Sequence, residues 1–281
     1  MKIALVQLAY GDDESVVDRV ARAADLVRAQ RGHDLVVLPE LWAAGGFSYR
    51  LWADRAEDLA GAVAAAMSAA ARDAGVTLLA GSIVERGSEV GAEGKDLWNT
   101  QLLFGADGEL LTRYRKIHRF GFQGGEPALM EAGDELVLVD LPDGTTGLDG
   151  TPGTPGTVRA GLTTCYDLRF PELYRALLDG GARMFVVPAA WPMRRVEHWT
   201  LLARARAIED QCFVVACNTA GTHARTLMGG HSIVVAPTGD VLAEAGADEQ
   251  VLSVEVDLDL VTTWREEFPV LGDRRLPQGL C

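Results

Sequence analysis

The sequence predicts an α/β fold, because segments with the pattern of strands alternate with segments with the pattern of helices in both halves of the chain. Residues 35–38 and 184–187 are continuous apolar runs, of the kind that a sheet buries on both faces. The chain has 281 residues, of which 48% are hydrophobic, so it can enclose a large core. No linker interrupts the pattern, and we expect one domain over residues 1–281.

The N-terminal half begins with a strand at residues 3–8, which acidic residues follow at once, so it does not have the form of a signal peptide. Apolar residues at helical spacing predict a helix over residues 15–31. An alanine-rich helix is expected over residues 54–73, closed by Gly75. Further strands are expected at residues 35–38, 76–83, 97–104 and, after a turn at residues 106–108, at 110–111.

The C-terminal half continues the alternation. Residues 116–135 are irregular and contain glycines, as active-site loops often do. Residues 142–157 are rich in Gly, Pro and Thr, and we expect an exposed loop without a chemical role. Pro171 can open a helix, because proline fits the first helical turn, and a second helix is expected over residues 197–210. Strands are expected at residues 136–139, 158–164, 184–187, 213–216, 232–235 and 251–256.

The composition argues against several classes of function. A net charge of −14 disfavours nucleic acids and anionic membrane surfaces as partners, since both are negatively charged. No segment approaches the roughly 18 apolar residues of a membrane-spanning helix. The four cysteines form no C-x-x-C pair, which suits a reducing cytoplasm and no disulfide framework. The five histidines form no metal-binding pattern and no nucleotide-binding loop occurs, so we expect no metal and no cofactor.

The most informative stretch begins at Cys165 and reads Cys-Tyr-Asp-Leu-Arg-Phe-Pro-Glu. Cys165 lies between an expected strand and an expected helix, at a sharp turn with free backbone N–H groups. Such groups can bind an oxyanion and lower the pKa of a thiol. Taken alone, however, a cysteine at a strand end is more often a small buried apolar residue than a nucleophile.

Two other motifs give this cysteine a context. One is the apolar run Leu-Val-Val-Leu-Pro-Glu, which ends at Glu40, and the other is Arg-Tyr-Arg-Lys-Ile-His, which contains Lys116. Each alone is typical of a solvated strand end or a solvated loop. Together with Cys165 they supply a base, an ammonium and a thiol. In this order they resemble the motifs of the nitrilase superfamily of carbon–nitrogen hydrolases, and the resemblance extends from residue 2 to about residue 275.

The resemblance implies a four-layer αββα sandwich with pseudo-twofold halves. It also implies a Glu-Lys-Cys triad that hydrolyses an amide through a thioester. Cys165 would be the nucleophile, its thiolate favoured by the ammonium of Lys116. Glu40 would move protons for the leaving amine and then for the water. Lys116 and the backbone N–H of Tyr166 would bind the oxyanion.

Further residues match conserved positions of the superfamily. Glu126, in Gly-Gly-Glu-Pro, falls where these enzymes place a second glutamate that orients the lysine or assists proton transfer, and Glu131 is a nearby competitor for this role. Asp167, Arg169 and Glu172 resemble scaffold positions. We expect a buried arginine–carboxylate pair among them to fix the turn that presents Cys165.

The residues after the cysteine favour an amidase over a nitrile-cleaving enzyme. Nitrile-cleaving members usually carry Trp-Glu at this point, whereas this chain has Tyr166 and Asp167. The segment at residues 191–209 is most similar to ω-amidases and deaminated-glutathione amidases, which remove ammonia from small amides that carry a carboxylate. An N-carbamoyl amide hydrolase on the same fold is an alternative, as is a catalytically silent protein whose acidic surface recruits a partner.

Three residues are candidates for contact with the substrate. Trp191 follows a strand, as pocket walls do, although a core aromatic is nearly as plausible. Tyr49, with Phe47 beside it, comes soon after Glu40 and is a comparable wall candidate. Arg119 stands where the superfamily often has leucine, and its guanidinium could bind a substrate carboxylate or point to solvent.

The C-terminal segment 264–281 mixes apolar and charged residues without a clear helical stripe. It has little reason to order on its own surface. It resembles the superfamily's C-terminal arm, which packs across a homodimer interface, so we expect a homodimer. A frayed terminus is the alternative.

Overall fold

The computed structural model describes residues 1–122, 124–143 and 156–275, and it contains two six-stranded sheets. The expected loop at residues 142–157 lies almost wholly outside the described residues. The first sheet has the order β14 (Gln250–Glu255), β1 (Lys2–Gln7), β2 (Leu35–Val37), β3 (Thr77–Arg86), β4 (Leu97–Phe104), β5 (Leu110–Arg115). The second has the order β6 (Leu138–Pro142), β7 (Thr157–Leu162), β8 (Met184–Ala189), β9 (Phe213–Asn218), β12 (Ile233–Val235), β13 (Val241–Glu244).

The two sheets share one pattern of strand directions. In the first, β1, β2 and β3 are parallel, β14 flanks them on one side and β4 and β5 on the other, each antiparallel to its neighbour. In the second, β7, β8 and β9 are parallel, with β6 on one side and β12 and β13 on the other. The prediction of two similar halves is therefore confirmed.

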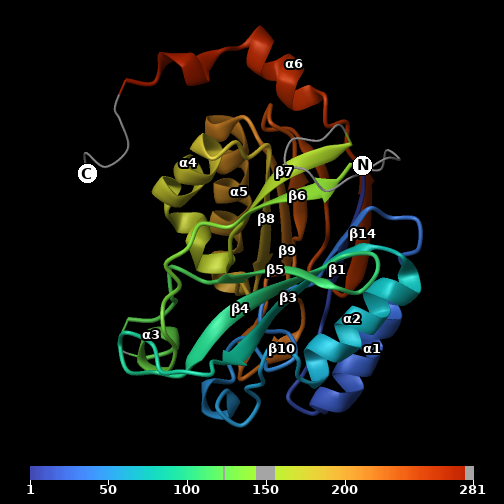
Figure 1. Cartoon of the computed structure of the whole chain (residues 1–281), viewed down its shortest axis with the longest axis vertical. Helices are drawn as coiled ribbons and strands as arrows, with labels where there is room; N and C mark the ends of the chain where they lie inside the picture. The colour runs from blue at the N-terminus through green and yellow to red at the C-terminus, as the bar shows by residue number, and fades with distance from the viewer. Residues whose placement is uncertain (123, 144–155, 276–281) are drawn as a thin grey trace.

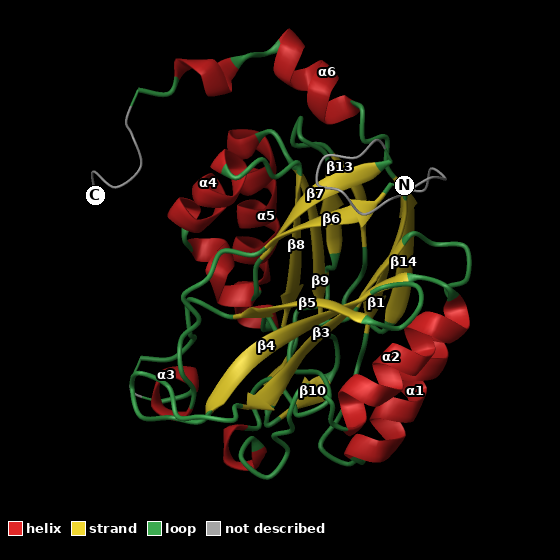
Figure 2. Ribbon diagram, viewed as in Figure 1, coloured by secondary structure: helices red, strands yellow, loops and turns green. Residues whose placement is uncertain are grey.

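Helices cover the outer face of each sheet, as the resemblance implies (Figure 1, Figure 2). Helices α1 (Val16–Arg28) and α2 (Ala62–Ala74) pack on the first sheet, and α4 (Pro171–Asp179) and α5 (Val196–Asp210) pack on the second. A separate apolar cluster, formed by the inner faces of both sheets, fills the space between them. The layer order is therefore αββα.

Local chemistry explains where the helices begin and end. Ser15 caps α1 by accepting a hydrogen bond from the N–H of Asp18 at 3.1 Å. Gly75 ends α2 in the left-handed conformation, as expected. The expected start of α2 at residue 54 was wrong by eight residues. The carboxylate of Glu57 accepts from the N–H groups of Val63 and Ala64, so the chain before residue 62 serves as a cap instead of joining the helix.

The C-terminal segment is more ordered than the sequence indicated. It contains α6 (Leu260–Glu267) and a short 3₁₀ helix, η4 (Val270–Asp273), which extend past the end of the second sheet (Figure 1). Arg265 donates to the carbonyls of Ala182, Asp210 and Gln211, and so ties α6 to the body of the protein. The expectation that this segment would not order on its own surface is therefore wrong up to residue 275.

Candidate active site

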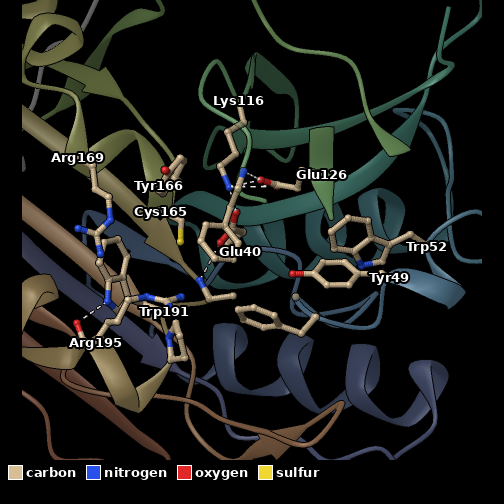
Figure 3. Close-up of a pocket in the computed structure, with 15 residues that line it drawn as sticks. Glu40, Tyr49, Trp52, Lys116, Glu126, Cys165, Tyr166, Arg169, Trp191 and Arg195 are labelled. Carbon is tan, nitrogen blue, oxygen red and sulfur yellow. Dashed lines mark hydrogen bonds and ion pairs between the residues drawn. The ribbon is translucent and has the colours of Figure 1, made fainter. Parts of the chain in front are cut away.

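Each residue of the expected triad lies within three residues of the end of a strand. The three side chains come together at the cavity shown in Figure 3. Glu40 comes three residues after β2, and Lys116 is the first residue beyond β5. Cys165 opens the 3₁₀ helix η2 (Cys165–Arg169) a short step after β7, and Glu126 opens the short helix α3 (Glu126–Leu129). The structure thus brings Glu40, Lys116, Glu126 and Cys165 to one place.

A bulge in β3 creates the room that Glu40 needs. The register between β3 and β4 shifts between Leu79 and Ser82, and Gly81 within this bulge has a φ of +67°. A Cβ atom on Gly81 would lie 1.8 Å from the carbonyl oxygen of Pro39, so only glycine allows the chain before Glu40 to pass this closely. The hydroxyl of Ser82 accepts a hydrogen bond from the N–H of Leu41 at 3.0 Å, and so fixes the residue that follows Glu40.

Lys116 lies between two carboxylates. Its Nζ is 2.7 Å from Oε1 of Glu40 and 2.8 Å from Oε2 of Glu126, and all three side chains are at least 96% buried. Asn99 in β4 donates from Nδ2 to both glutamates, at 2.8 Å to Glu40 and 2.6 Å to Glu126. The N–H of Ala190 donates to the other oxygen of Glu40 at 2.9 Å.

The charges in this cluster stabilise one another. Burial alone would lower the pKa of Lys116, but the negative charges of Glu126 and Glu40 outweigh burial and raise it well above its ordinary value. The charged ammonium form of Lys116 is therefore favoured at neutral pH. Burial raises the pKa of Glu126, and the charge of Lys116 opposes this rise.

Cys165 has a strained backbone conformation. Its φ is +46°, which is unusual for a residue with a side chain, and its side chain is buried. Burial raises the pKa of its thiol well above the ordinary value, and the charge of Glu40 adds to this effect more than Lys116 opposes it. Lys116 lowers the pKa of the thiol, in the expected direction, but burial and Glu40 outweigh its effect. A raised pKa disfavours the thiolate, so an attack by this sulfur would call for a base that takes its proton.

These residues line a small cavity of about 30 Å³. Tyr166 and Trp191 line it together with Phe47 and Tyr49, so the expected wall residues all reach it. In Figure 3, Tyr49 and Trp52 lie on one side of Cys165, and Arg169, Trp191 and Arg195 lie on the other. One wall is thus aromatic, and the other combines an indole with two guanidinium groups.

The two arginines of the second wall have no carboxylate partner within the described ranges. Arg169 donates to Nδ1 of His198 at 3.2 Å and lies 4.7 Å from the centre of the Trp191 ring. Arg195, at the end of η3 (Met193–Arg195), lies 5.1 Å from the centre of the Phe120 ring. Burial and the positive charges of two neighbouring arginines lower the pKa of Arg195. A negative charge in the cavity would therefore be stabilised.

The turn at Cys165 is fixed differently from the expectation. The carboxylate of Asp167 accepts from the hydroxyl of Tyr114 at 2.7 Å, from the N–H and Nδ1 of His118, and from the N–H of Thr164 at 2.8 Å. It does not pair with Arg169, which faces the cavity instead, and Glu172 is exposed. The expected arginine–carboxylate pair is thus replaced by a buried tyrosine–aspartate–histidine cluster.

Two other candidates lie outside the cavity. The guanidinium of Arg119 forms a two-point contact with Glu93 and donates to the carbonyl of Met130 at 2.7 Å. This corrects the suggestion that Arg119 binds a substrate carboxylate. Glu131 accepts from the N–H groups of Glu93 and Lys95, so it does not compete with Glu126 for Lys116.

Sequence reasoning missed Asn99 and Arg195. Asn99 carried a signal, since it lies in a strand in which every residue is buried, and a polar side chain there needs a partner. Within the described ranges, no group of three or more His, Cys, Asp or Glu side chains is arranged to hold a metal ion.

A carbon–nitrogen hydrolase family model matches residues 2–266. The chain belongs to the carbon–nitrogen hydrolase family. This carbon–nitrogen hydrolase is 44% identical to a 2-oxoglutaramate amidase of Paenarthrobacter nicotinovorans, over 98% of this chain and 90% of the relative. It is 33% identical to the omega-amidase NIT2 of Homo sapiens, over 98% of this chain and 95% of the relative.

Solved structures agree with the sequence relatives. Saccharomyces cerevisiae Nit3, a member of branch 10 of the nitrilase superfamily, has a TM-score of 0.81 at 29% identity, covering 98% of this hydrolase and 97% of the yeast chain. A CN-hydrolase superfamily protein of Xanthomonas campestris has a TM-score of 0.84 at 29% identity, covering 99% and 98%. The protein is thus a hydrolase of the nitrilase superfamily that acts on carbon–nitrogen bonds other than peptide bonds.

Proposed function

We propose that this protein removes ammonia from a small amide that carries a carboxylate, and that its substrate is 2-oxoglutaramate or an amide of closely similar shape. The observation that carries this proposal is the pair of guanidinium groups, Arg169 and Arg195, in the wall of the cavity that also holds Cys165. Arginine binds carboxylates with two parallel hydrogen bonds. Relatives named as 2-oxoglutaramate amidases and omega-amidases support the same substrate class.

The first half of the reaction forms a thioester. Glu40 takes the proton of the Cys165 thiol while the sulfur attacks the amide carbon. The oxyanion that forms receives hydrogen bonds from Lys116 and from the backbone N–H of Tyr166. Glu40 then gives its proton to the amide nitrogen, the carbon–nitrogen bond breaks, and ammonia leaves.

The second half returns the enzyme to its starting state. Glu40 takes a proton from a water molecule, whose oxygen attacks the thioester carbon. The carbon–sulfur bond breaks, and the thiol of Cys165 regains its proton. Glu126 remains paired with Lys116 throughout, so the ammonium keeps a counter-charge even while Glu40 is protonated.

The cavity must widen to admit this substrate. Its volume of about 30 Å³ accommodates one or two water molecules, which is less than a five-carbon amide requires. Tyr49 and Arg195 lie on opposite walls (Figure 3), so small rotations of these side chains would open it.

Ammonia release from a panel of compounds tests the proposal. The panel contains 2-oxoglutaramate, the neutral butyramide, N-carbamoyl-β-alanine and a nitrile. We expect the highest kcat/KM with 2-oxoglutaramate, and Arg195→Gln should lower that value about tenfold or more while leaving butyramide unchanged. Cys165→Ala should abolish turnover in a folded protein, whereas Cys212→Ala should not. Preference for the N-carbamoyl compound, or turnover by Cys165→Ala, would overturn the proposal.

We also propose that the protein acts as a cytoplasmic homodimer that binds no nucleic acid. The free buried thiols of Cys212 and Cys217 suit a reducing compartment. The net charge of −14 opposes contact with phosphate backbones. In the part of the chain that the structure describes, no helix is long and apolar enough to cross a membrane.

A further inference from the structure

A second cavity, of about 630 Å³, adjoins the catalytic cavity. Phe47 and Tyr49 line both, so these two side chains form part of the wall between them. The other sides of the second cavity are formed by Tyr10 and Asp12, by the 3₁₀ helix η1 (Tyr49–Leu51) and by the hairpin of β10 (Thr222–His223) and β11 (Thr226–Leu227). Figure 1 shows β10 at the same end of the molecule as the blue loop that carries η1. Its volume is typical of small-molecule sites.

The charge of this cavity is opposite to that of the whole protein. Arg19, Arg50, Arg55 and Arg225 line it, and Asp12 is the one acid among the described lining residues. Both oxygens of Asp12 accept from the N–H of Ala224 at 2.9 Å, so this carboxylate is engaged with the turn of the hairpin. A local positive potential in a protein with a net charge of −14 draws anions to this place.

Three of these arginines are available to a ligand. Arg19 is not, because it pairs with Glu14 and donates to several backbone carbonyls. In the described ranges, no carboxylate lies within ion-pair distance of Arg50, Arg55 or Arg225. Arg55 donates to the carbonyl of Ala44, and burial and the charge of Arg19 lower its pKa. An anion would relieve this repulsion.

The wall of the cavity also contains an unpaired donor. His223 is 1% exposed, and its Nε2 accepts from the N–H of Phe47 at 3.3 Å, so the proton of the neutral ring is on Nδ1. Nδ1 has no hydrogen-bond partner among the described residues. Burial lowers the pKa of His223 to about 4, which keeps the ring neutral at physiological pH. A buried donor without a partner is costly unless a ligand or water satisfies it.

We propose that this cavity, named here the arginine pocket, binds the small carboxylate anions that the reaction consumes and releases. The choice of carboxylates rests on the proposed function; the anion site itself rests on the arginines alone. Arg50 and Arg225 come from two segments that face one ligand space, and each guanidinium can hold one carboxylate in a two-point contact. The pocket thereby concentrates anionic substrate beside the catalytic cavity, with which it shares Phe47 and Tyr49 as lining residues.

Equilibrium dialysis with labelled succinate tests the site without any turnover. We expect Arg50→Ala/Arg225→Ala to bind one succinate fewer per chain than the wild type. Both side chains are exposed, so the double variant should fold. The matched control Arg31→Ala/Arg72→Ala removes the same charge from other exposed positions and should bind as the wild type does. Equal binding by all three proteins overturns the site. Binding of inorganic phosphate but not succinate overturns the assignment of carboxylates.

Steady-state kinetics test the role in catalysis. For 2-oxoglutaramate, kcat/KM of the wild type should fall as NaCl increases. In Arg50→Ala/Arg225→Ala it should be about fivefold to tenfold lower at low salt and depend less on salt. Butyramide turnover should be unchanged in this variant. An unchanged salt dependence overturns the concentrating role. A third outcome separates the two proposals. If Arg50→Ala/Arg225→Ala binds one succinate fewer but the wild type releases no ammonia from any amide, the proposed function is contradicted and the anion site is not.

Discussion

Lys116 contacts two carboxylates, those of Glu40 and Glu126, and the second one matters when the first takes up a proton. In the proposed reaction Glu40 becomes protonated, and with a single ion pair this would leave a buried Lys116 without a counter-charge. Glu126 contacts the same Nζ through both oxygens, at 3.0 and 2.8 Å, so a second carboxylate stays beside the ammonium. The site therefore keeps one fixed ion pair and one carboxylate that is free to carry a proton.

This arrangement predicts strong coupling between Glu40 and Lys116. Glu40→Gln keeps the shape but removes proton transfer, for which a loss of roughly 10² to 10⁴ in kcat is typical. Lys116→Ala removes an oxyanion donor and should cost about 10² or more. Because both residues act in the same step, the double variant should lose far less than the product of the two losses. Kinetics of ammonia release measure this, and multiplicative losses would mean that the residues act independently.

The candidate catalytic residues could be chosen from the sequence, because each lies in a local motif that can be recognised without the tertiary structure. Glu40, Lys116 and Cys165 each follow an expected strand in a recognisable context. Asn99 and Arg195 lie in no such motif. Asn99 acts through its position between two glutamates, and Arg195 acts through the direction of a 3₁₀ turn, both of which depend on tertiary structure.

At the scale of single elements, apolar runs predicted most of the strands. The start of α2 was placed too early, because the sequence pattern does not show that Glu57 caps the helix. β4 has the predicted bounds, although polar residues 99–101 interrupt its apolar pattern. The short strands β10, β11 and β13 were missed, because each is brief and largely polar or exposed. α6 was missed because only Val261 of its residues is buried, so it lacks an apolar stripe.

The end of α5 gives a prediction for stability as a function of pH. Burial raises the pKa of Asp210 from 3.8 to about 7, although Arg175 lies 3.1 Å from its carboxylate. Between these values the folded state holds a proton that the unfolded state has lost, so this residue makes stability fall as pH rises from about 4 to about 7. Above pH 7 its contribution is constant.

Thermal unfolding between pH 4 and 8 measures this effect. Asp210→Asn should remove the fall, so its Tm relative to wild type should rise by several degrees from pH 4 to pH 8. Asp54→Asn, at an exposed acid before α2, should follow the wild type at every pH. A constant difference in Tm between Asp210→Asn and the wild type would refute this prediction.

At the scale of the whole molecule, the arrangement of two similar halves was predicted from the resemblance to the superfamily and not from the periodicity of apolar residues. Apolar runs indicate strands but do not say which of the twelve strands of the two large sheets lie side by side. The matching strand directions of the two sheets arise from contacts far apart in sequence, such as those of β1 with β14. The active site shares this property, since the first sheet supplies Glu40 and Lys116 and the second supplies Cys165.

The prediction for the whole molecule is that its C-terminal segment forms part of a homodimer interface. α6 and η4 leave Phe268 and Val270 substantially exposed, with 54% and 39% of their surface accessible, which is apolar area that a partner subunit could cover. Deletion from Trp264 onward should weaken the homodimer at least tenfold. Phe268→Asp/Val270→Asp should do the same while leaving the Arg265 anchor intact. Light scattering at micromolar protein decides it, and a monomeric full-length enzyme with normal turnover would defeat the prediction.

The pairing of β14 with β1 also governs how the protein can be made. One edge of β1 pairs with β14, residues 250–255, so this edge stays unpaired until nearly the whole chain has been synthesised. An open strand edge pairs readily with other chains. The nascent N-terminal half therefore exposes an unpaired strand edge until residues 250–255 have been made, and we expect it to be prone to aggregation before then. Chains that terminate before residue 250 are expected to need chaperones or to be degraded.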